Sequence, residues 1–517
     1  MNLTFAGAAR TVTGSCYILD TQHGELMVDR GLYQGSRSLQ ARNWDRGPRD
    51  MSRIRWLLLT HAHIDHSGLI PRLKSQGFRG RIFATEATTD LCRIMLADSG
   101  HIHEEDAKYE TKKWIRRGRL GPEPRPLYGV ADAEEALGFF EPVPYNETVA
   151  LAPGLRARFL DAGHILGSAT LELWVAENGR ETKIVFSGDI GRPHVPILRD
   201  PTTVESADLL LIESTYGDRA HEAASGLGRA FLNIVATTCS VGGHVVIPSF
   251  AVGRTQMIIY HLNDLIESRR LPPIPTYIDS PLAVEATRVF RRHRECYDPA
   301  TLQRIESGDD PFQFPNLHFV GSTAESQRLN DLEGQAIIIS ASGMCTAGRI
   351  RHHLKHNVGD PRNTILFVGY QAENTLGRKI VEGATYITLF GEKRRVRAKV
   401  ESIQGFSAHA DQSELLGWLA AVPQRPKLVF AVHGETRPAL TLAHCISEGL
   451  GLPAYVPHLH EVTDLGQLDA LLAAAAQQRA AFAEQLAAND PAHPTPDGNT
   501  QGEQDQTDCE AEALRDA

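Results

Sequence analysis

Four potential metal ligands lie within six positions in the segment Thr60-His61-Ala62-His63-Ile64-Asp65-His66. Because His61 and His63 are two residues apart, both side chains can face the same side of an extended loop. Asp65 and His66 follow where a helix is expected to begin, and they can serve a second ion. Imidazole and carboxylate groups suit zinc, and also manganese or iron. A polar surface loop explains this density of ligands poorly, so we predict a metal site here.

Two later residues have the chemistry of further ligands. His164 lies among glycines in DAGHILGS, and Asp189 ends the apolar segment KIVFSGD. Each residue alone is weak evidence for a metal site, because such positions are also typical of turns and caps. An aspartate can, however, bridge two cations through its two oxygens. Asp29, which ends the segment ELMVD, is expected to orient a ligand histidine rather than to bind metal itself.

These reactive residues follow short apolar segments that are typical of buried strands. IRWLLL precedes the His61 loop, and KIVFSGD and LLLIES have the same richness in Val, Ile and Leu. In α/β architectures, sites gather at the carboxyl ends of strands. We therefore assign residues 1–213 to the first part of an α/β domain that carries the metal site.

The pattern changes over residues 214–385. HVVIPS, QAIIISAS and TILFVGY are near-continuous apolar strands that alternate with helical stretches. This alternation predicts a parallel sheet covered by helices on both faces. Residues 386–470 return to the short apolar segments that are typical of residues 1–213. A helix is expected over residues 463–485 with Thr463 or Asp464 as its N-cap, and 471–517 is assigned as the end of this helix and an acidic disordered tail.

Composition excludes some classes of protein. The 517 residues are too many for one core, and no apolar run is long enough for a membrane span or a signal peptide. The seven cysteines are scattered, which fits a reducing cytoplasm better than a disulfide scaffold. The net charge is −10, but residues 489–517 hold eight acids and one base, so the body is near −3. Despite this negative net charge, the basic runs around Arg116, Arg291 and Lys393 could form local positive surfaces that bind phosphate.

The order of these motifs resembles a known family. Asp29, the HxHxDH stretch, His164 and Asp189 resemble the four motifs of metallo-β-lactamase-fold hydrolases. Glu213, His409 in GFSAHAD and His433 in AVHGE resemble motifs A, B and C of the β-CASP nucleases. The resemblance covers about residues 1–460 and is greatest to prokaryotic relatives of the pre-mRNA 3′-end cleavage subunit, with the RNase J type ranked second. It implies an αββα sandwich with an inserted β-CASP domain. A histidine at motif C favours RNA over DNA.

The resemblance also implies a two-zinc site and a mechanism. One zinc would take His61, His63 and His164, and the other would take Asp65, His66 and His433. Asp189 would bridge the two. His409 is the expected general acid, with Glu213 holding its imidazole oriented and charged. Without the resemblance, the stretch around His409 is equally well explained as a helix N-cap.

Phosphate contacts are expected from turns of the inserted domain, where backbone amides between strand and helix can face anions. The candidates are Ser249, Arg254, Ser342, Gly343 and Arg378. Ordinary strand-to-helix turns explain each of them equally well. Tyr216, Phe250 and Tyr370 are candidates for stacking on bases, although core packing also explains them.

The expected function is a zinc-dependent ribonuclease that acts on single-stranded RNA as an endonuclease, a 5′-exonuclease or both. Manganese would accept the same ligands, and the resemblance also allows a homodimer. A small-molecule hydrolase for thioesters or lactones explains residues 1–213 equally well, but it does not explain Glu213, His409, His433 or the inserted segment. A non-catalytic RNA-binding subunit is the third alternative, and it would require broken ligand sets.

Overall fold

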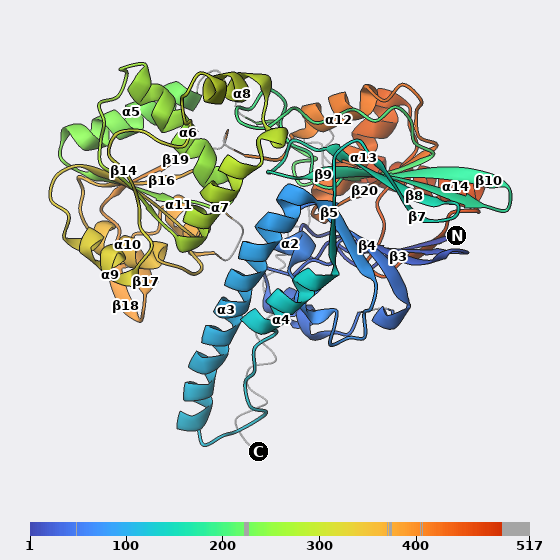
Figure 1. Cartoon of the computed structure of the whole chain (residues 1–517), viewed down its shortest axis with the longest axis horizontal. Helices are drawn as coiled ribbons and strands as arrows, with labels where there is room; N and C mark the ends of the chain where they lie inside the picture. The colour runs from blue at the N-terminus through green and yellow to red at the C-terminus, as the bar shows by residue number, and fades with distance from the viewer. Residues whose placement is uncertain are drawn as a thin grey trace, which may run out of the picture.

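The computed structural model describes residues 1–47, 49–221, 227–369, 371, 375–403, 405 and 407–488. The acidic tail that we expected to be disordered lies outside the described residues. Within the described chain, three extended sheets and their helices form two domains, which lie side by side in Figure 1. No helix in this part of the chain is both long enough and apolar enough to cross a membrane.

The metal-site domain contains two seven-stranded sheets packed face to face. The first has the order β22 (Val462–Asp464), β1 (Asn2–Phe5), β2 (Tyr17–Thr21), β3 (Gly24–Val28), β4 (Ile54–Leu58), β5 (Arg81–Thr85) and β6 (Phe140–Val143). The second has the order β21 (Ala454–Tyr455), β20 (Leu428–Val432), β11 (Leu209–Glu213), β10 (Arg180–Phe186), β9 (Ala169–Glu177), β8 (Leu155–Asp161) and β7 (Thr148–Ala152). Their inner faces share one apolar core, in which the rings of Phe5 and Phe430 lie 5.2 Å apart.

Helices cover the outer faces of both sheets. The first sheet packs against α3 (Glu86–Arg116) through Leu91 and Leu96, with α2 (Ile64–Ser67) and α4 (Val130–Ala136) beside it. The second sheet packs against α12 (Gln412–Ala420) and α13 (Thr436–Leu450) through Leu415 and Leu442. The domain is therefore an αββα sandwich, which confirms the predicted fold class. The short α1 (Arg37–Ala41) lies between β3 and β4 in the chain.

The inserted segment forms a six-stranded sheet in which every pairing is parallel. Its order is β14 (Leu317–Phe319), β13 (Thr276–Asp279), β15 (Ala336–Ser340), β12 (His244–Pro248), β16 (Thr364–Phe367) and β19 (Lys399–Ser402). The described helices of the segment are α5 (Leu227–Ser240), α6 (Arg254–Glu267), α7 (Pro281–Arg292), α8 (Pro299–Glu306), α9 (Thr323–Arg328), α10 (Ile350–Asn357) and α11 (Leu376–Val381). Ile247 packs toward Ile258 of α6, whereas its neighbour Val246 packs toward Leu354 of α10. Since alternate residues are buried on opposite faces, the central strands β12, β15 and β16 are apolar and almost wholly buried, as predicted.

After residue 385 the chain adds a hairpin and one further strand of the inserted sheet. The hairpin of β17 (Tyr386–Leu389) and β18 (Glu392–Arg395) follows residue 385, and β19 then returns to pair with β16. The four domain boundaries themselves stay a prediction.

The predicted start of the last helix is wrong. Val462–Asp464 forms β22 and pairs antiparallel with β1, and the helix α14 begins only afterwards, spanning Leu468–Ala488. The free edge of β1 supplies backbone partners for these residues, and a helix there would have left that edge unpaired. Pairing between distant segments has therefore overridden the helix-favouring composition of the segment.

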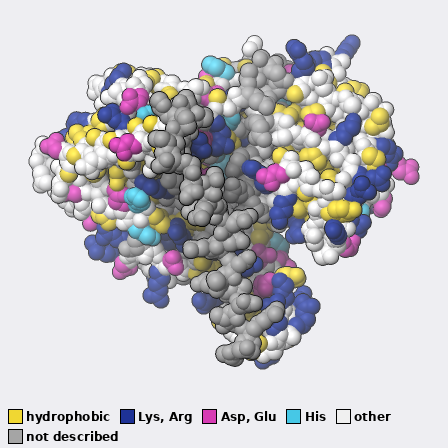
Figure 2. Space-filling model, turned by 180° about the vertical axis from the view of Figure 1, so that it is seen from behind, with side chains coloured by type: hydrophobic (Ala, Val, Ile, Leu, Met, Phe, Trp, Pro, Cys, Tyr) yellow, Lys and Arg dark blue, Asp and Glu magenta, His cyan; other side chains and the backbone are white. Residues whose placement is uncertain are grey.

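The helix α3 extends well beyond the sheet that it covers and forms a projecting arm (Figure 1). Arg116, Arg117 and Arg119 are exposed at its far end, where Figure 2 shows Lys and Arg side chains gathered. The first of the predicted basic runs is therefore a charged surface. In the second run, Arg291 pairs with Asp310 and Arg292 pairs with Asp90, so that its charge is largely compensated.

Candidate metal centre

The loop that follows β4 carries the ligand-rich segment from the core to the edge of the sheet. His63 is the N-cap of α2, and the short helix turns His66 back toward the loop, so that His61 and His66 are both buried. Gly31 allows this loop to lie close to its neighbours, because a Cβ atom there would lie 1.6 Å from the carbonyl oxygen of Asp65. The close sequence spacing thus becomes a compact cluster of side chains.

The first group of ligand atoms combines His61, His63, His164 and Asp189. The Nδ1 atom of His63 lies 3.1 Å from Nε2 of His61 and 3.2 Å from Nε2 of His164. The Asp189 Oδ2 atom lies 3.4 Å from the His61 Nε2 atom and 3.6 Å from the His164 Nε2 atom. These four atoms surround one point.

A second group combines Asp65, His66 and His433. The Nε2 atoms of His66 and His433 lie 3.0 Å apart, and Asp65 Oδ2 lies 3.5 Å from His433 Nε2. The other oxygen of Asp189, Oδ1, lies 3.3 Å from His66 Nε2 and 3.4 Å from His433 Nδ1. One carboxylate therefore faces both groups, each through a different oxygen.

The remaining members of the cluster lie in turns that are distant in sequence from the His61 loop. His164 follows Gly163, and its backbone amide donates to Ser168 Oγ at 3.0 Å. Asp189 follows Gly188, at the end of β10. His433 follows β20 and itself has a positive φ of 49°. Its amide is held by the carbonyl of Ala8 at 2.7 Å, so that a strained backbone angle is fixed by the loop that follows β1 of the other sheet.

The chemistry of the donor set fits metal ions. Burial lowers the pKa of His61 and His164, and it lowers the pKa of His63 to about 4, so these imidazoles are neutral and have free lone pairs. The buried Oδ1 atom of Asp189 has no hydrogen-bond partner within the described chain. Ligand atoms of a tetrahedral zinc ion lie about 3.3 Å apart, close to the separations found here. The side chains can therefore hold metal.

Asp29 lies directly behind the cluster. It is buried, with a positive φ of 59°, and its Oδ2 atom accepts from His66 Nδ1 at 2.7 Å. The same carboxylate also accepts from the amide of Thr60 at 2.8 Å, from its hydroxyl at 3.0 Å and from Ser15 at 3.1 Å. This contact fixes the ring of His66 with Nε2 toward the cluster, the geometry expected of an orienting residue.

Glu213 and His409 form a pair at one side of the cluster. Glu213 is fully buried at the end of β11, and its Oε1 atom accepts from the amide of Ile190 at 2.6 Å. Its two oxygens lie 3.2 Å and 3.1 Å from His409 Nδ1. Burial alone would lower the pKa of His409, but the carboxylates of Glu213 and Asp189 raise it to about 9. His409 is thus a partly exposed imidazolium, and its Nε2 atom makes no hydrogen bond within the described residues.

The candidate phosphate contacts are less uniform. Ser249 and Ser342 follow β12 and β15 at the carboxyl edge of the inserted sheet, but both hydroxyls already make hydrogen bonds within their own loops. Gly343 packs closely on the ring of Phe250, and Arg378 donates to Glu382 at 2.6 Å. Arg254 alone among the five lines a pocket together with His164.

The stacking candidates have different surroundings. Tyr216 is buried, 6.1 Å from the His409 ring, and Phe250 is exposed. Tyr370 lies outside the described residues. Sequence reasoning missed Arg192, which follows Asp189 by three positions and lines the same pocket as Arg254. A basic residue close behind a ligand aspartate was the available signal.

Comparisons with known proteins agree with this arrangement. Residues 9–78 match the metallo-β-lactamase superfamily, residues 255–380 match the β-CASP domain, and residues 393–457 match a Zn-dependent metallo-hydrolase RNA specificity domain. The fold and the cluster thus define a metal-binding hydrolase of the metallo-β-lactamase type.

Curated relatives make the assignment more specific. The chain is 38% identical over 447 residues to Ribonuclease TTHA0252 of Thermus thermophilus, covering 86% of this chain and 96% of the relative. It is 32% identical to an RNase J-like protein of Methanocaldococcus jannaschii, with 88% and 97% covered. It is 30% identical to Transcription termination factor FttA of the same organism, with 88% and 70% covered. The chain belongs to the β-CASP ribonuclease family, as its motifs predicted.

One solved structure shows the same fold at low identity. It is described as a protein of unknown function from Enterococcus faecalis V583, with a TM-score of 0.51 and 10% identity. The match covers 89% of this chain and 99% of that chain, and it concerns the fold alone.

Proposed function

We propose that this chain is a zinc-dependent ribonuclease that hydrolyses RNA phosphodiester bonds and leaves 5′-phosphate and 3′-hydroxyl ends. One observation carries the proposal: the buried carboxylate of Asp189 faces two groups of metal ligands, beside the charged His409–Glu213 pair. Two curated relatives with almost complete coverage are named as a ribonuclease and as RNase J-like.

We assign two ions to the cluster, zinc by preference, with manganese able to use the same ligands. His61, His63 and His164 would hold one ion, and Asp65, His66 and His433 would hold the other. Asp189 would contact both. When bound, such a pair lowers the pKa of a bound water and offsets the negative charge of a phosphodiester.

The chain's own residues complete the reaction. His409 is placed to give a proton to the leaving 3′-oxygen, since its ring is charged and Glu213 fixes Nδ1 on the far side. Glu213 lies behind the ring, on its Nδ1 side, and does not need to contact the substrate. Asp29 keeps His66 facing the cluster. General-acid catalysis of this kind contributes typically ~10²–10⁴-fold to the rate.

Single-stranded RNA is the proposed substrate, entering between the sandwich and the inserted domain. Phosphate contacts from Ser249, Arg254, Ser342, Gly343 and Arg378 remain part of this proposal, with Arg254 the best supported. The exposed arginines at the end of the α3 arm add positive charge that attracts the RNA strand. A small-molecule hydrolase is not favoured, because it leaves the inserted domain and the His409–Glu213 pair without a role. A non-catalytic subunit is not favoured either, since no ligand position is lost.

The compartment and the oligomeric state remain predictions. The six cysteines within the described residues are free thiols, which fits the reducing cytoplasm. Formation of a homodimer is tested by light scattering during size-exclusion chromatography.

The proposal is tested with end-labelled linear RNA and with circular RNA, each with and without a chelator. We expect cleavage that needs metal, with 5′-phosphate products, and cleavage of circles establishes endonuclease action. His409→Ala should lower turnover by roughly 10²–10⁴-fold with the metal content unchanged. His194→Ala, at an exposed histidine, is the matched control. Hydrolysis of a thioester or a lactone in the absence of RNA cleavage would refute the proposal, and loss of metal from His409→Ala would refute the acid's role.

A further inference from the structure

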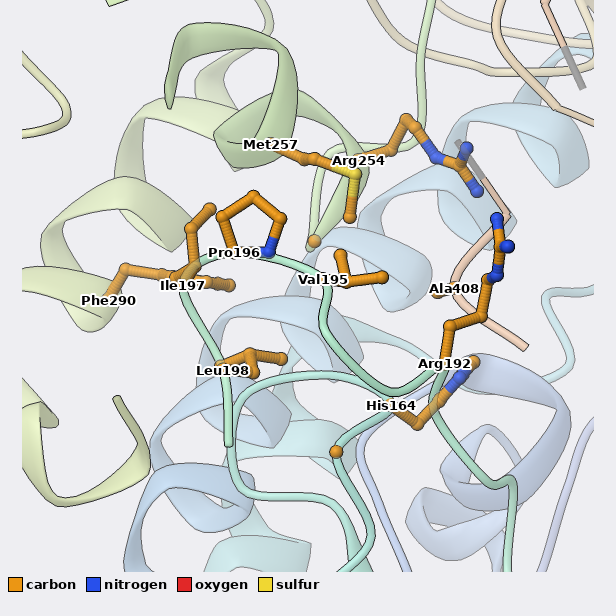
Figure 3. Close-up of a pocket in the computed structure, with 12 residues that line it drawn as sticks. His164, Arg192, Val195, Pro196, Ile197, Leu198, Arg254, Met257, Phe290 and Ala408 are labelled. Atoms are coloured by element: carbon orange, nitrogen blue, oxygen red, sulfur yellow. The ribbon is translucent and has the colours of Figure 1, made fainter. Parts of the chain in front are cut away.

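Two arginines from different domains meet at one end of a pocket beside the metal centre. Arg192 comes from the loop after β10 in the sandwich, and Arg254 is the first residue of α6 in the inserted domain. Figure 3 shows the two guanidinium groups pointing toward each other. His164 and Ala408, the neighbour of His409, line the same pocket.

Arg254 carries a charge that its surroundings do not neutralise. Its Nη1 atom is sealed from solvent and has no hydrogen-bond partner within the described chain. Burial, and to a smaller extent the charge of the nearby Arg192, lower the pKa of Arg254 to about 10. The residue also begins α6, where the helix dipole disfavours a cation. A half-buried cation with a sealed, unpaired N–H group is destabilising in this position unless an anion joins it.

Arg192 is held in place by a single carboxylate. Its Nε atom donates to both oxygens of Glu414 at 3.2 Å and 3.3 Å, and Nη1 donates to the Gly405 carbonyl at 2.8 Å. Glu414 also accepts from the amide of Asp411 within the N-terminal cap of α12. Within the described residues, Glu414 is the one carboxylate paired with either guanidinium, so the two arginines together keep a net positive charge.

The rest of the pocket is lined mainly by apolar side chains. Val195, Pro196 and Ile197 form one wall, and Met257 lies opposite on α6 (Figure 3). Apolar walls hold few water molecules, so an anion here would interact strongly with the arginines. Gly369 packs beside this guanidinium, since a Cβ atom there would lie in ordinary contact, 3.4 Å from Nη1 of Arg254.

We propose that Arg192 and Arg254 together hold one backbone phosphate of the RNA strand, next to the phosphodiester that is cut. The inference rests on the proposed ribonuclease function and deepens it. A bound phosphate would bridge the two domains, since each supplies one arginine. It would also fix the register of the strand, because the pocket and the metal centre share His164.

The test uses RNA in which one neutral methylphosphonate linkage is moved along the strand, with binding measured in the His409→Ala background. With both arginines present, we expect one linkage near the cut at which neutralisation weakens binding by roughly 10-fold to 100-fold. Arg254→Met should weaken binding of unmodified RNA by a similar factor. At that linkage it should cause no further loss, whereas at other linkages the two losses should multiply. The slope of log K against log salt should also fall by about 0.7.

Thermal melting separates this role from a structural one. Because Arg254→Met removes an uncompensated, half-buried charge, its melting temperature should equal or exceed that of the parent, whereas a structural role predicts a decrease. Arg362→Met is the matched control, since this exposed arginine pairs with Asp360 at the opposite, amino end of β16. If the losses from Arg254→Met and from the methylphosphonate multiply at every linkage while the parent still cuts RNA, the phosphate site alone is refuted. A parent that neither binds nor cuts RNA would overturn the proposed function as well.

Discussion

Replacing Glu213 by glutamine should make the enzyme's activity depend on pH in a new way. Glutamine has the size of glutamate and can keep the 2.6 Å hydrogen bond from the Ile190 amide through its Oε1 atom. It removes the negative charge that lies 3.1 Å from His409 Nδ1. The pKa of His409, raised to about 9 with Glu213 present, should therefore fall toward its ordinary value near 6.5.

The size of the effect follows from the fraction of His409 that carries a proton. With a pKa of about 9, roughly nine-tenths of the imidazole is charged at about pH 8. With a pKa of about 6.5, the fraction at the same pH is about 0.03, a loss of roughly 30-fold. At about pH 6 the two fractions differ by less than twofold. The cleavage rate of the variant should therefore be close to that of the parent at about pH 6 and much lower at about pH 8.

The assay is single-turnover RNA cleavage from about pH 6 to pH 9, with metal content measured for each protein. Glu172→Gln is the control, because Glu172 is another fully buried glutamate and its partners are Arg158 and Lys183 on the sandwich. An equal loss at all pH values would show that Glu213 has a structural role only. Loss of metal from Glu213→Gln would place Glu213 among the ligands, and either result would refute the reasoning.

Three further predictions concern the metal centre. Asp29→Asn should weaken metal binding by roughly 10-fold to 100-fold in a chelator competition, because His66 loses its ionic partner; unchanged affinity would contradict the orienting role. Gly191→Ala would place a Cβ atom 1.9 Å from the Gly163 carbonyl oxygen, so it should destabilise the fold by about 1–3 kcal/mol and displace His164. Gly138→Ala, with open space around it, is the control, and equal melting of the two variants would contradict the packing argument. Chelation should abolish RNA cleavage and lower the melting temperature, and zinc should restore both; an unchanged melting temperature would show that the cluster binds no stabilising ion.

Local patterns predicted much of the fold and part of the site. The apolar strands of the inserted domain and the ligand-rich loop after β4 are recognisable because neighbouring residues suffice to define them. His433 is different, since it lies 367 positions from the histidine that it faces. Only the order of motifs along the whole chain linked the two, through resemblance to a family. The predicted start of α14 was wrong because β1, which pairs with Val462–Asp464, lies at the other end of the chain.

Contacts between distant side chains could not be predicted in the same way. Ser15 and Thr60 hold Asp29, and their hydroxyls are ordinary until the sheets bring them together. Arg192 stands three positions after Asp189, but its meaning depends on Arg254, which comes from another domain. The residues that support a site are therefore less visible in a sequence than the residues that perform its chemistry.

The backbone at the cluster explains why these supports are needed. Asp29 and His433 both have positive φ angles, which are unfavourable for residues with a side chain. Asp29 is fixed by the contacts of its carboxylate, and His433 is fixed by Ala8 through its amide and by Ser214 through its carbonyl. The partners of His433 come from the loops that follow β1 in one sheet and β11 in the other, so the strained angle persists only while the two sheets stay packed together. The energy of sheet packing thus holds a ligand at an angle that the local sequence would not adopt, and changes in the apolar core between the sheets should loosen the metal centre before they unfold the domain.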